Sequence, residues 1–453
     1  MKDLSKKLLF SFALVLLFAL AACGGDSDSD QEAGGENTDS ESTSEENESD
    51  SSGEEKTIEF MHLWPEGSSK QHHDIVNEII ADFEAENEGV SVEVEILSNE
   101  QYKEKLKVLS TSNELPDVGM TWAAGFLEPY VSGNMFASLD DLLEGPLNDM
   151  FVPGTAEAYA LDGTTYGLPL ELNITPLYYN KRIFEENGVE VPETFEEFKE
   201  VSQTLVDNGV TPIALGNKDR WTGSMWYMYL ADRIGGAELL NDAILGEASF
   251  EDPALIEAAE EVKSLVDMGA FLNGYNGLGN DEAKGYFLNE QAAMYLMGSW
   301  DLPEFTTSEE NSQEFKDSID YMKFPLVEGG KGDRDSFVGG PGVGMFVAEN
   351  SEVKDEAKEF VSFFVQKWGE QSVEKAGVIP ATKVDTESVD LPQMYVDVLN
   401  DLNESSNITL YADVQLSAAA AETHLDMIQA LFGDAVTPEE FAQNHEEAIS
   451  SGE

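Results

Sequence analysis

The chain has 453 residues, with 90 Asp and Glu against 25 Lys and Arg, and its formal net charge at pH 7 is −65. So acidic a surface is a poor partner for nucleic acid and for anionic lipid headgroups, because both repel it. The chain contains one cysteine, so no disulfide can form within it, and the fold must be stabilised by an apolar core.

The N-terminal sequence predicts export. Three lysines precede an apolar run over residues 8–20, which is shorter than the roughly 20 residues of a membrane-spanning helix, so residues 1–22 are typical of a signal peptide. The letters LAAC at 20–23 resemble the lipobox of bacterial lipoproteins, whose cleavage leaves an acylated cysteine as the first residue. Cys23 is therefore the predicted lipidation site. The alternative is an ordinary signal peptide in which Cys23 is incidental.

Residues 23–56 form a predicted tether. From residue 24 onward they hold 13 Asp and Glu and one Lys, with no aromatic residue and no Leu, Ile or Val. Such a segment cannot bury enough apolar area to offset the entropy of ordering the chain. As a flexible coil it would reach roughly 30 Å, and further because its charges repel one another.

Residues 57–453 are numerous enough for two lobes with separate cores. An α/β order is expected at their start. Apolar residues predict strands near 58–63, 90–96 and 116–120, and helical spacing predicts helices near 75–83 and 103–109. Strands alternating with helices in this way indicate a parallel sheet with right-handed crossovers.

Three further helices carry N-terminal signals. Thr194 begins a capping-box pattern, Asp252 precedes a proline at the first helical position, and Thr437 combines both signals. We therefore expect helices to begin after each of these residues.

Tryptophans stand where strands enter loops, the positions at which open α/β sheets bind ligands. Flat aromatic faces cover the C–H faces of a sugar ring, and carboxylates and amides bind its hydroxyl rim. Trp368 instead lies on a helical face with phenylalanines, which predicts a core position. The predicted ligand-binding residues are Trp64, Glu66, Trp122, Glu171, Asn173, Trp221, Trp226, Trp300, Asp301 and Gly340.

Several segments in order carry a family resemblance: TIEFMHLWPEG, LPDVGMTWAAGFLEPYVSGNMFASLDDLL, YGLPLELNITPLYYNKRIFEENGVEVPETFEEF, LADRIGG, AAMYLMGSWDLPEF, SFVGGPGVGMFVAENS and AGVIPATK. Together they are similar to family 1 extracellular solute-binding proteins, the sugar-binding lipoproteins of ABC importers, which are related to maltose-binding protein. The similarity extends over essentially all of residues 57–450.

The resemblance implies a periplasmic-binding-protein type II fold, an α/β architecture with two parallel-sheet lobes joined by hinge crossings. Lobe 1 is expected at about 57–170 and 341–378, and lobe 2 at about 175–336 and 380–453. The expected crossings lie at 171–175, 337–340 and 377–380, where Gly339 and Gly340 tolerate backbone angles that other residues avoid.

The resemblance also implies the site. Trp122 takes the aromatic position after the strand that begins with Pro-Asp, and Trp300 matches the tryptophan that follows the glycine in MGSW. Two departures from maltose-binding protein argue against maltose. TWAAG lacks a charged pair after its tryptophan, and DVQLSAAAAETHL has no aromatic residue where that relative has its last stacking ring.

The implied function is capture without chemistry. A lipid-anchored monomer on the outer face of the cell membrane is expected to close over a carbohydrate, an oligosaccharide, and to dock on the permease subunits, whose cytoplasmic ATPase drives release. No enzyme activity, nucleic-acid partner, cofactor or metal is expected. Adjacent His72 and His73 point about 100° apart on a helix and are interpreted as a solvated face.

Two alternatives stay open. The same fold could bind a glycerophosphodiester or another polyol; the former requires cations in the cleft, for which Lys218 and Arg220 are the candidates. A lipoprotein glycosidase would need two carboxylates about 5–10 Å apart across the scissile bond, and no such pair stands out.

Overall fold

The computed structural model describes residues 55–383 and 389–451. The signal peptide, Cys23 and nearly all of the predicted tether lie outside the described residues. The first strand, β1 (Lys56–His62), begins at the last residue assigned to the tether. No helix in the described part of the chain is long and apolar enough to cross a membrane.

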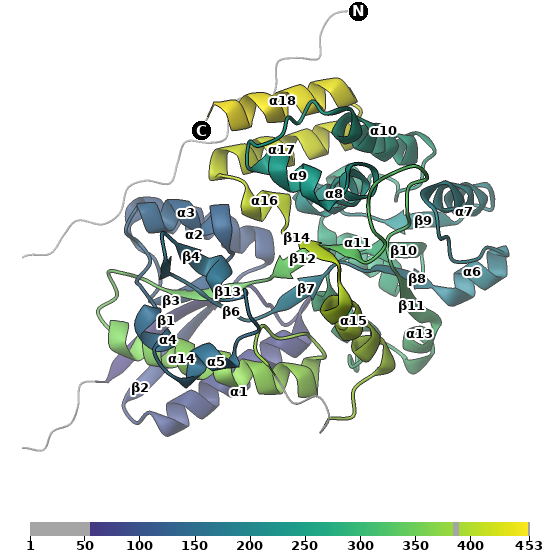
Figure 1. The fold of residues 1–453 in the computed structure, drawn as a ribbon. Helices are drawn as coiled ribbons and strands as arrows, with labels where there is room; N and C mark the ends of the chain where they lie inside the picture. Colours follow the sequence, from purple (N-terminus) through teal and green to yellow (C-terminus); the bar gives the residue numbers. More distant parts are fainter. Residues whose placement is uncertain (1–54, 384–388, 452–453) are drawn as a thin grey trace, which may run out of the picture. The chain divides into compact units, whose positions relative to one another are not determined.

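The first lobe is built on a five-stranded sheet with the order β2-β1-β3-β13-β6 (Figure 1). β1 pairs in parallel with both neighbours, as predicted, but β13 runs antiparallel to β3 and to β6, because the chain returns to this lobe after building the second. The sheet is therefore mixed. Its further strands are β2 (Val90–Ile96), β3 (Val118–Thr121), β6 (Leu168–Pro169) and β13 (Gly344–Val347).

Helices of the first lobe follow the expected periodicity. α1 (Lys70–Glu86) buries its apolar face and packs beside α14 (Lys354–Gln371). The others are α2 (Asn99–Ser112), α3 (Ala124–Ser132), α4 (Asp140–Leu143) and α5 (Pro146–Met150), with a small hairpin of β4 (Ala160–Leu161) and β5 (Thr164–Thr165).

The second lobe is built on a four-stranded mixed sheet with the order β11-β8-β10-β9. β10 is parallel to β9, and β8 is antiparallel to both of its neighbours. The strands are β8 (Leu177–Asn180), β9 (Thr211–Ala214), β10 (Ala292–Leu296) and β11 (Ile319–Met322).

Most helices of the described residues belong to this lobe. α8 (Trp221–Gly235) packs against α10 (Pro253–Asp267), α9 (Ala237–Ile244) and α17 (Ala418–Phe432). The remaining helices are α6 (Lys181–Asn187), α7 (Phe195–Asp207), α11 (Asn280–Leu288), α12 (Leu302–Phe305), α13 (Gln313–Ser318), α15 (Gln393–Glu404), α16 (Ala412–Gln415) and α18 (Pro438–Ser450), with short turns η2 (Asn217–Asp219) and η4 (Ser299–Asp301).

The three predicted helix starts are confirmed. Thr194 and Thr437 each make both hydrogen bonds of a capping box, at α7 and α18. The Asp252 side chain accepts a hydrogen bond from the Ala254 backbone N–H at the start of α10. These local signals therefore identify the helix ends correctly.

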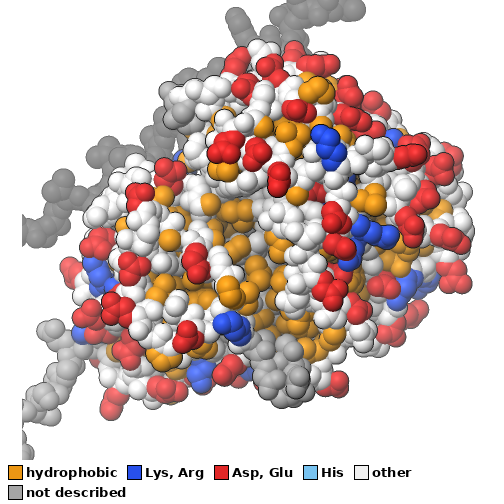
Figure 2. All heavy atoms as spheres, viewed as in Figure 1, with side chains coloured by type: hydrophobic (Ala, Val, Ile, Leu, Met, Phe, Trp, Pro, Cys, Tyr) orange, Lys and Arg blue, Asp and Glu red, His pale blue; other side chains and the backbone are white. Residues whose placement is uncertain are grey.

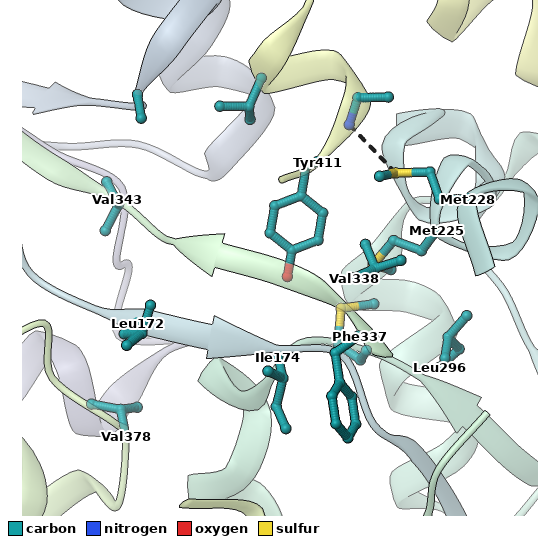
Figure 3. Close-up of a cluster of buried hydrophobic side chains, with 14 of the residues drawn as sticks. Leu172, Ile174, Met225, Met228, Leu296, Phe337, Val338, Val343, Val378 and Tyr411 are labelled. Carbon is teal, nitrogen blue, oxygen red and sulfur yellow. Dashed lines mark hydrogen bonds between the residues drawn. The ribbon is translucent and has the colours of Figure 1, made fainter. Parts of the chain in front are cut away.

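Three segments run between the lobes, near the expected crossings. β7 (Leu172–Ile174) follows β6 and leads to β8, and β12 (Ser336–Pro341) leads back to β13. β7 pairs antiparallel with β12, which pairs in parallel with β14 (Asn407–Thr409). The third segment, at residues 377–380, contacts β7, because the Leu172 backbone N–H donates to the Ile379 carbonyl at 3.0 Å. Figure 3 shows the apolar side chains of β7 and β12 packed around these crossings.

Candidate ligand-binding cleft

A cavity of about 620 Å³ lies between the two lobes. This volume falls within the range of small-molecule sites, roughly 300–1,000 Å³. Its walls come from the β1–α1 loop, α2 and α3 on one side and from α8, α11, η4 and α16–α17 on the other. Figure 2 shows hydrophobic side chains in the hollow between the lobes, with acidic side chains around it.

The second lobe supplies an aromatic wall of three rings. Trp300 lies between Trp221 and Tyr411, with ring centroids 6.0 and 5.9 Å away. Trp300 is partly exposed, so its ring can be touched by a ligand. The Trp221 Nε1 atom is buried and has no hydrogen-bond partner among the described residues. The wall therefore offers flat apolar faces and an unused donor.

The first lobe supplies a second aromatic wall. Trp122 packs edge-to-face on Phe126 with centroids 4.8 Å apart, and Tyr130 continues the row along α3. The Lys103 ammonium lies 5.0 Å from the centre of the Trp122 ring, within cation–π range. Trp64 is more deeply set: its ring stacks on Trp368 with centroids 4.6 Å apart and is only 5% exposed.

The floor of the cavity is polar and belongs to the crossing strands. The Asn173 amide nitrogen donates to Glu171 Oε2 at 3.4 Å, and its carbonyl oxygen accepts from the Ser299 hydroxyl at 2.9 Å. Glu171 Oε1 and His72 Nε2 lie 3.3 Å apart, yet neither atom makes a hydrogen bond in the described part of the protein. The two atoms are within ion-pair distance of each other and neither makes a hydrogen bond, so a hydroxyl group that reached them would use hydrogen-bonding capacity that the described residues leave unused.

Seven of the ten predicted residues line this cavity: Trp64, Trp122, Glu171, Asn173, Trp221, Trp300 and Asp301. Glu66 does not, since it is exposed in the turn before α1. Gly340 contributes backbone to β12 beside the cavity, and its neighbours Pro341 and Gly342 line it instead.

Trp226 is buried in the core of the second lobe, so the expectation that it faces a ligand is corrected. Five residues along a helix turn a side chain by about 140°, which directs Trp226 away from Trp221. Its ring packs against Phe198, Phe271 and Phe324. Trp368, predicted to be a core residue, is confirmed as one, at 1% exposure.

Sequence reasoning missed several residues of the site, and His72 and Tyr411 show why. His72 is buried at the cavity floor, so the interpretation of His72 as part of a solvated face is wrong. Tyr411 fills the wall beside Trp300, although the segment that follows it was noted for lacking an aromatic ring. Tyr411 lies two residues before the segment DVQLSAAAAETHL, so its position next to that segment was the signal that could have identified it.

Charge in the cavity is predominantly negative. Nine carboxylates line it, from Glu100, Glu104, Glu171, Asp219, Asp281, Asp301, Glu304, Asp413 and Glu422, against four cations from Lys103, Lys107, Arg220 and Lys284. Arg220 is held by Glu422 and Asp426 at 2.8 and 2.6 Å. Burial, and then the nearby Glu100 carboxylate of α2, raise the pKa of Asp219.

Comparison with known proteins identifies a family to which the chain is similar. The profile of bacterial extracellular solute-binding proteins matches residues 69–367. The multiple sugar-binding protein of Streptococcus mutans is 26% identical over 318 residues, which are 68% of this chain and 70% of that protein. A putative binding protein of Brucella abortus is 25% identical over 309 residues, 66% of this chain and 71% of its own.

Solved structures agree with this family. A structure from work on xylan utilisation by the thermophilic bacterium Caldanaerobius polysaccharolyticus has a TM-score of 0.81 and 34% identity, and covers 87% of this chain and 100% of that one. A chitin oligosaccharide binding protein has a TM-score of 0.80 at 23% identity, over 88% and 99% of the two chains, which shows the shared fold.

Proposed function

Because this chain belongs to the family of bacterial extracellular solute-binding proteins, we propose that it captures an oligosaccharide between its lobes and delivers it to the permease of an ABC importer. One observation carries the proposal: aromatic walls from both lobes line the cavity above a polar floor. Aromatic faces fit the C–H faces of a sugar ring, and the Trp221 Nε1 and Glu171 Oε1 atoms, which make no hydrogen bond among the described residues, fit its hydroxyl rim.

The charge of the cavity favours a neutral ligand over a phosphodiester. A phosphate group needs cations whose donors are available. Here the Arg220 guanidinium is already engaged by two carboxylates, and carboxylates outnumber cations along the lining. Lys218, the other cation considered for a phosphodiester, does not line the cavity. A sugar has no charge that these carboxylates would repel.

The similarity to proteins of sugar transport supports the same ligand class. The relative from Streptococcus mutans is a multiple sugar-binding protein, and the structure with 34% identity comes from work on xylan utilisation. We therefore place xylo-oligosaccharides first among the sugars to be tested.

The proposed mechanism is closure about the crossing strands. A sugar that contacts both aromatic walls binds the closed form better than the open form, and it shifts the equilibrium by that difference in affinity. No bond is made or broken. The proposal also includes lobe boundaries near the crossings. Lipidation of Cys23 and the acidic tether would hold a monomer on the outer face of the membrane, which raises its effective concentration at the permease.

A binding screen tests the proposal. Xylo-, malto- and chito-oligosaccharides, monosaccharides and glycerophosphodiesters are added to the purified protein, and the melting temperature is measured along with the release of reducing ends. We expect a sugar to raise the melting temperature with no new reducing ends. Release of reducing ends would contradict the proposal and support a glycosidase. A rise in melting temperature with a glycerophosphodiester alone would show that the ligand is a phosphodiester and not a sugar.

Matched variants locate the site. Trp300→Ala should reduce the rise in melting temperature that the sugar causes, because it removes the central ring of the second lobe's aromatic wall. Tyr286→Ala removes an exposed ring of α11 outside the cavity and should retain the full rise. Equal responses of the two variants would place the sugar elsewhere.

A further inference from the structure

Lys284 joins the two lobes across the cavity. Its side chain extends from α11 of the second lobe, and its ammonium donates to the Ser68 backbone carbonyl of the first lobe at 3.2 Å. The same ammonium donates to Asp301 Oδ1 of the second lobe at 3.3 Å. The residue is 7% exposed, so these contacts are made away from bulk water.

Asp301 is fixed in turn by its own lobe. Its Oδ2 atom accepts a hydrogen bond from the Tyr295 hydroxyl at 3.0 Å, and it directly follows Trp300, the central ring of the aromatic wall. Lys284 is thus held beside the aromatic wall of the second lobe, and it contacts the first lobe at the Ser68 carbonyl. Opening the cleft would break the contact with Ser68 and leave the contact with Asp301 intact.

The charge of Lys284 is maintained in this position. Burial alone lowers the pKa of a lysine, but the Asp301, Glu304 and Asp281 carboxylates outweigh it and raise the pKa of Lys284. A buried ammonium gains more from a carbonyl acceptor than an exposed one does, because charge-assisted hydrogen bonds are stronger than neutral ones and water does not compete.

We propose that Lys284 is a positioning residue that stabilises the closed form of the protein by hydrogen bonding the Ser68 carbonyl across the cleft. An ammonium has three donors, and Ser68 and Asp301 occupy two of them. The third is available to an oxygen atom of a ligand in the same cavity. The inference rests on the proposed function, because it supposes that binding and closure are coupled.

The experiment compares variants that differ in the lysine alone. Removing Lys284 by itself would leave the buried Asp301 carboxylate without its cation, so we use Lys284→Met combined with Asp301→Asn and compare it with Asp301→Asn alone. Lys331→Met, which removes an exposed lysine of the second lobe, controls for the change in charge. The full chain is used with Cys23→Ser, so that spin labels attach only to introduced cysteines.

Labels at Val108→Cys in α2 and Tyr286→Cys in α11 report the separation of the lobes, since both positions are exposed and their helices line opposite sides of the cavity. Electron–electron double resonance on ligand-free protein should show longer distances in the double variant than in Asp301→Asn, with Lys331→Met unchanged. The affinity for the sugar found in the screen should fall about tenfold, the effect of losing one charge-assisted hydrogen bond.

The outcomes separate this inference from the proposed function. If the double variant keeps the distances and the affinity of Asp301→Asn, the role of Lys284 in closure is overturned while sugar binding stands. If no sugar binds but the ligand-free distances lengthen, the role of Lys284 stands and the proposed ligand fails. Melting temperatures of all variants show whether each lobe is still folded.

Discussion

Gly298→Ala should displace Trp300, the central ring of the second lobe's aromatic wall, without unfolding the protein. A Cβ atom at Gly298 would lie 2.2 Å from Trp300 Cζ3 and 2.4 Å from two other ring carbons. Carbon atoms pack best at about 3.5–4.0 Å, so the ring would have to retreat by roughly 1.3 Å. The backbone of Gly298 has φ −64° and ψ 158°, which any residue adopts, so the glycine is required for space alone.

The expected effect is on binding more than on stability. Overpacking a core costs about 1–3 kcal/mol, and the cost should be at the lower end here because the Trp300 ring borders a cavity into which it can move. A stacking contact with an aromatic ring contributes about 0.5–1.5 kcal/mol. Misplacing the ring should therefore weaken sugar binding by about tenfold, which corresponds to about 1.4 kcal/mol.

Isothermal titration with the sugar found in the screen measures the effect, and Gly285→Ala is the matched control. A Cβ atom at Gly285 meets nothing within 4 Å, and the position lies in the neighbouring helix α11. That variant should bind as the wild type does and be slightly more stable, since alanine favours a helix over glycine by about 1 kcal/mol. Wild-type affinity in Gly298→Ala would refute the placement of the ligand against Trp300.

Three further predictions concern packing, pH and salt. Gly119→Ala should lower the melting temperature in differential scanning calorimetry, because its Cβ would lie 2.6 Å from two carbons of the Phe346 ring within the first lobe. Gly145→Ala, with nothing within 4 Å, should not, and equal melting temperatures would contradict this packing. Burial lowers the pKa of His445 to about 4, so the unfolded chain binds this proton first as pH falls. His445 should thus contribute a loss of about 3 kcal/mol in the free energy of unfolding between pH 6.5 and 4. In urea titrations His445→Gln should therefore lose less stability than the wild type over this range, and identical pH profiles would contradict the assignment. Because the chain carries a net charge of −65, raising NaCl from about 0.1 to 1 M shortens the screening length from about 10 to 3 Å and should raise the melting temperature, whereas a fall would show that self-repulsion is not limiting.

Local signals in the sequence predicted local structure well. The apolar spacing of α1 and the capping residues of α7 and α18 act within a few positions of the chain, and the structure has these elements where they were expected. The parallel sheets were a less accurate prediction. β13 enters the first sheet antiparallel to β3 from more than 200 residues further along the chain, and no local pattern specifies that pairing.

The site was also predicted only in part, because some of its residues are placed by local structure and others by contacts between distant segments. Trp122 and Trp300 end up in the cavity because their strands deliver them to its edge. Trp226 does not, because its helix turns it into the core, and helical phase could have indicated this. Lys284 could not have been found, since its contact with Ser68 joins positions 216 residues apart that belong to different lobes.

The floor of the cavity lies on the strands that cross between the lobes, which are the hinge of the proposed mechanism. Asn173 lies in the crossing strand β7, and a Cβ atom at Gly339 of β12 would lie 2.2 Å from its backbone carbonyl oxygen. A Cβ at Gly342 would lie 2.5 Å from its side-chain nitrogen, while Ser299 of the second lobe holds its side-chain oxygen. Asn173 therefore cannot move independently of β12 and Ser299. A ligand bound to Glu171 or Asn173 would contact the crossing strands themselves, so under the proposed mechanism any bending of these strands should change the affinity of the floor.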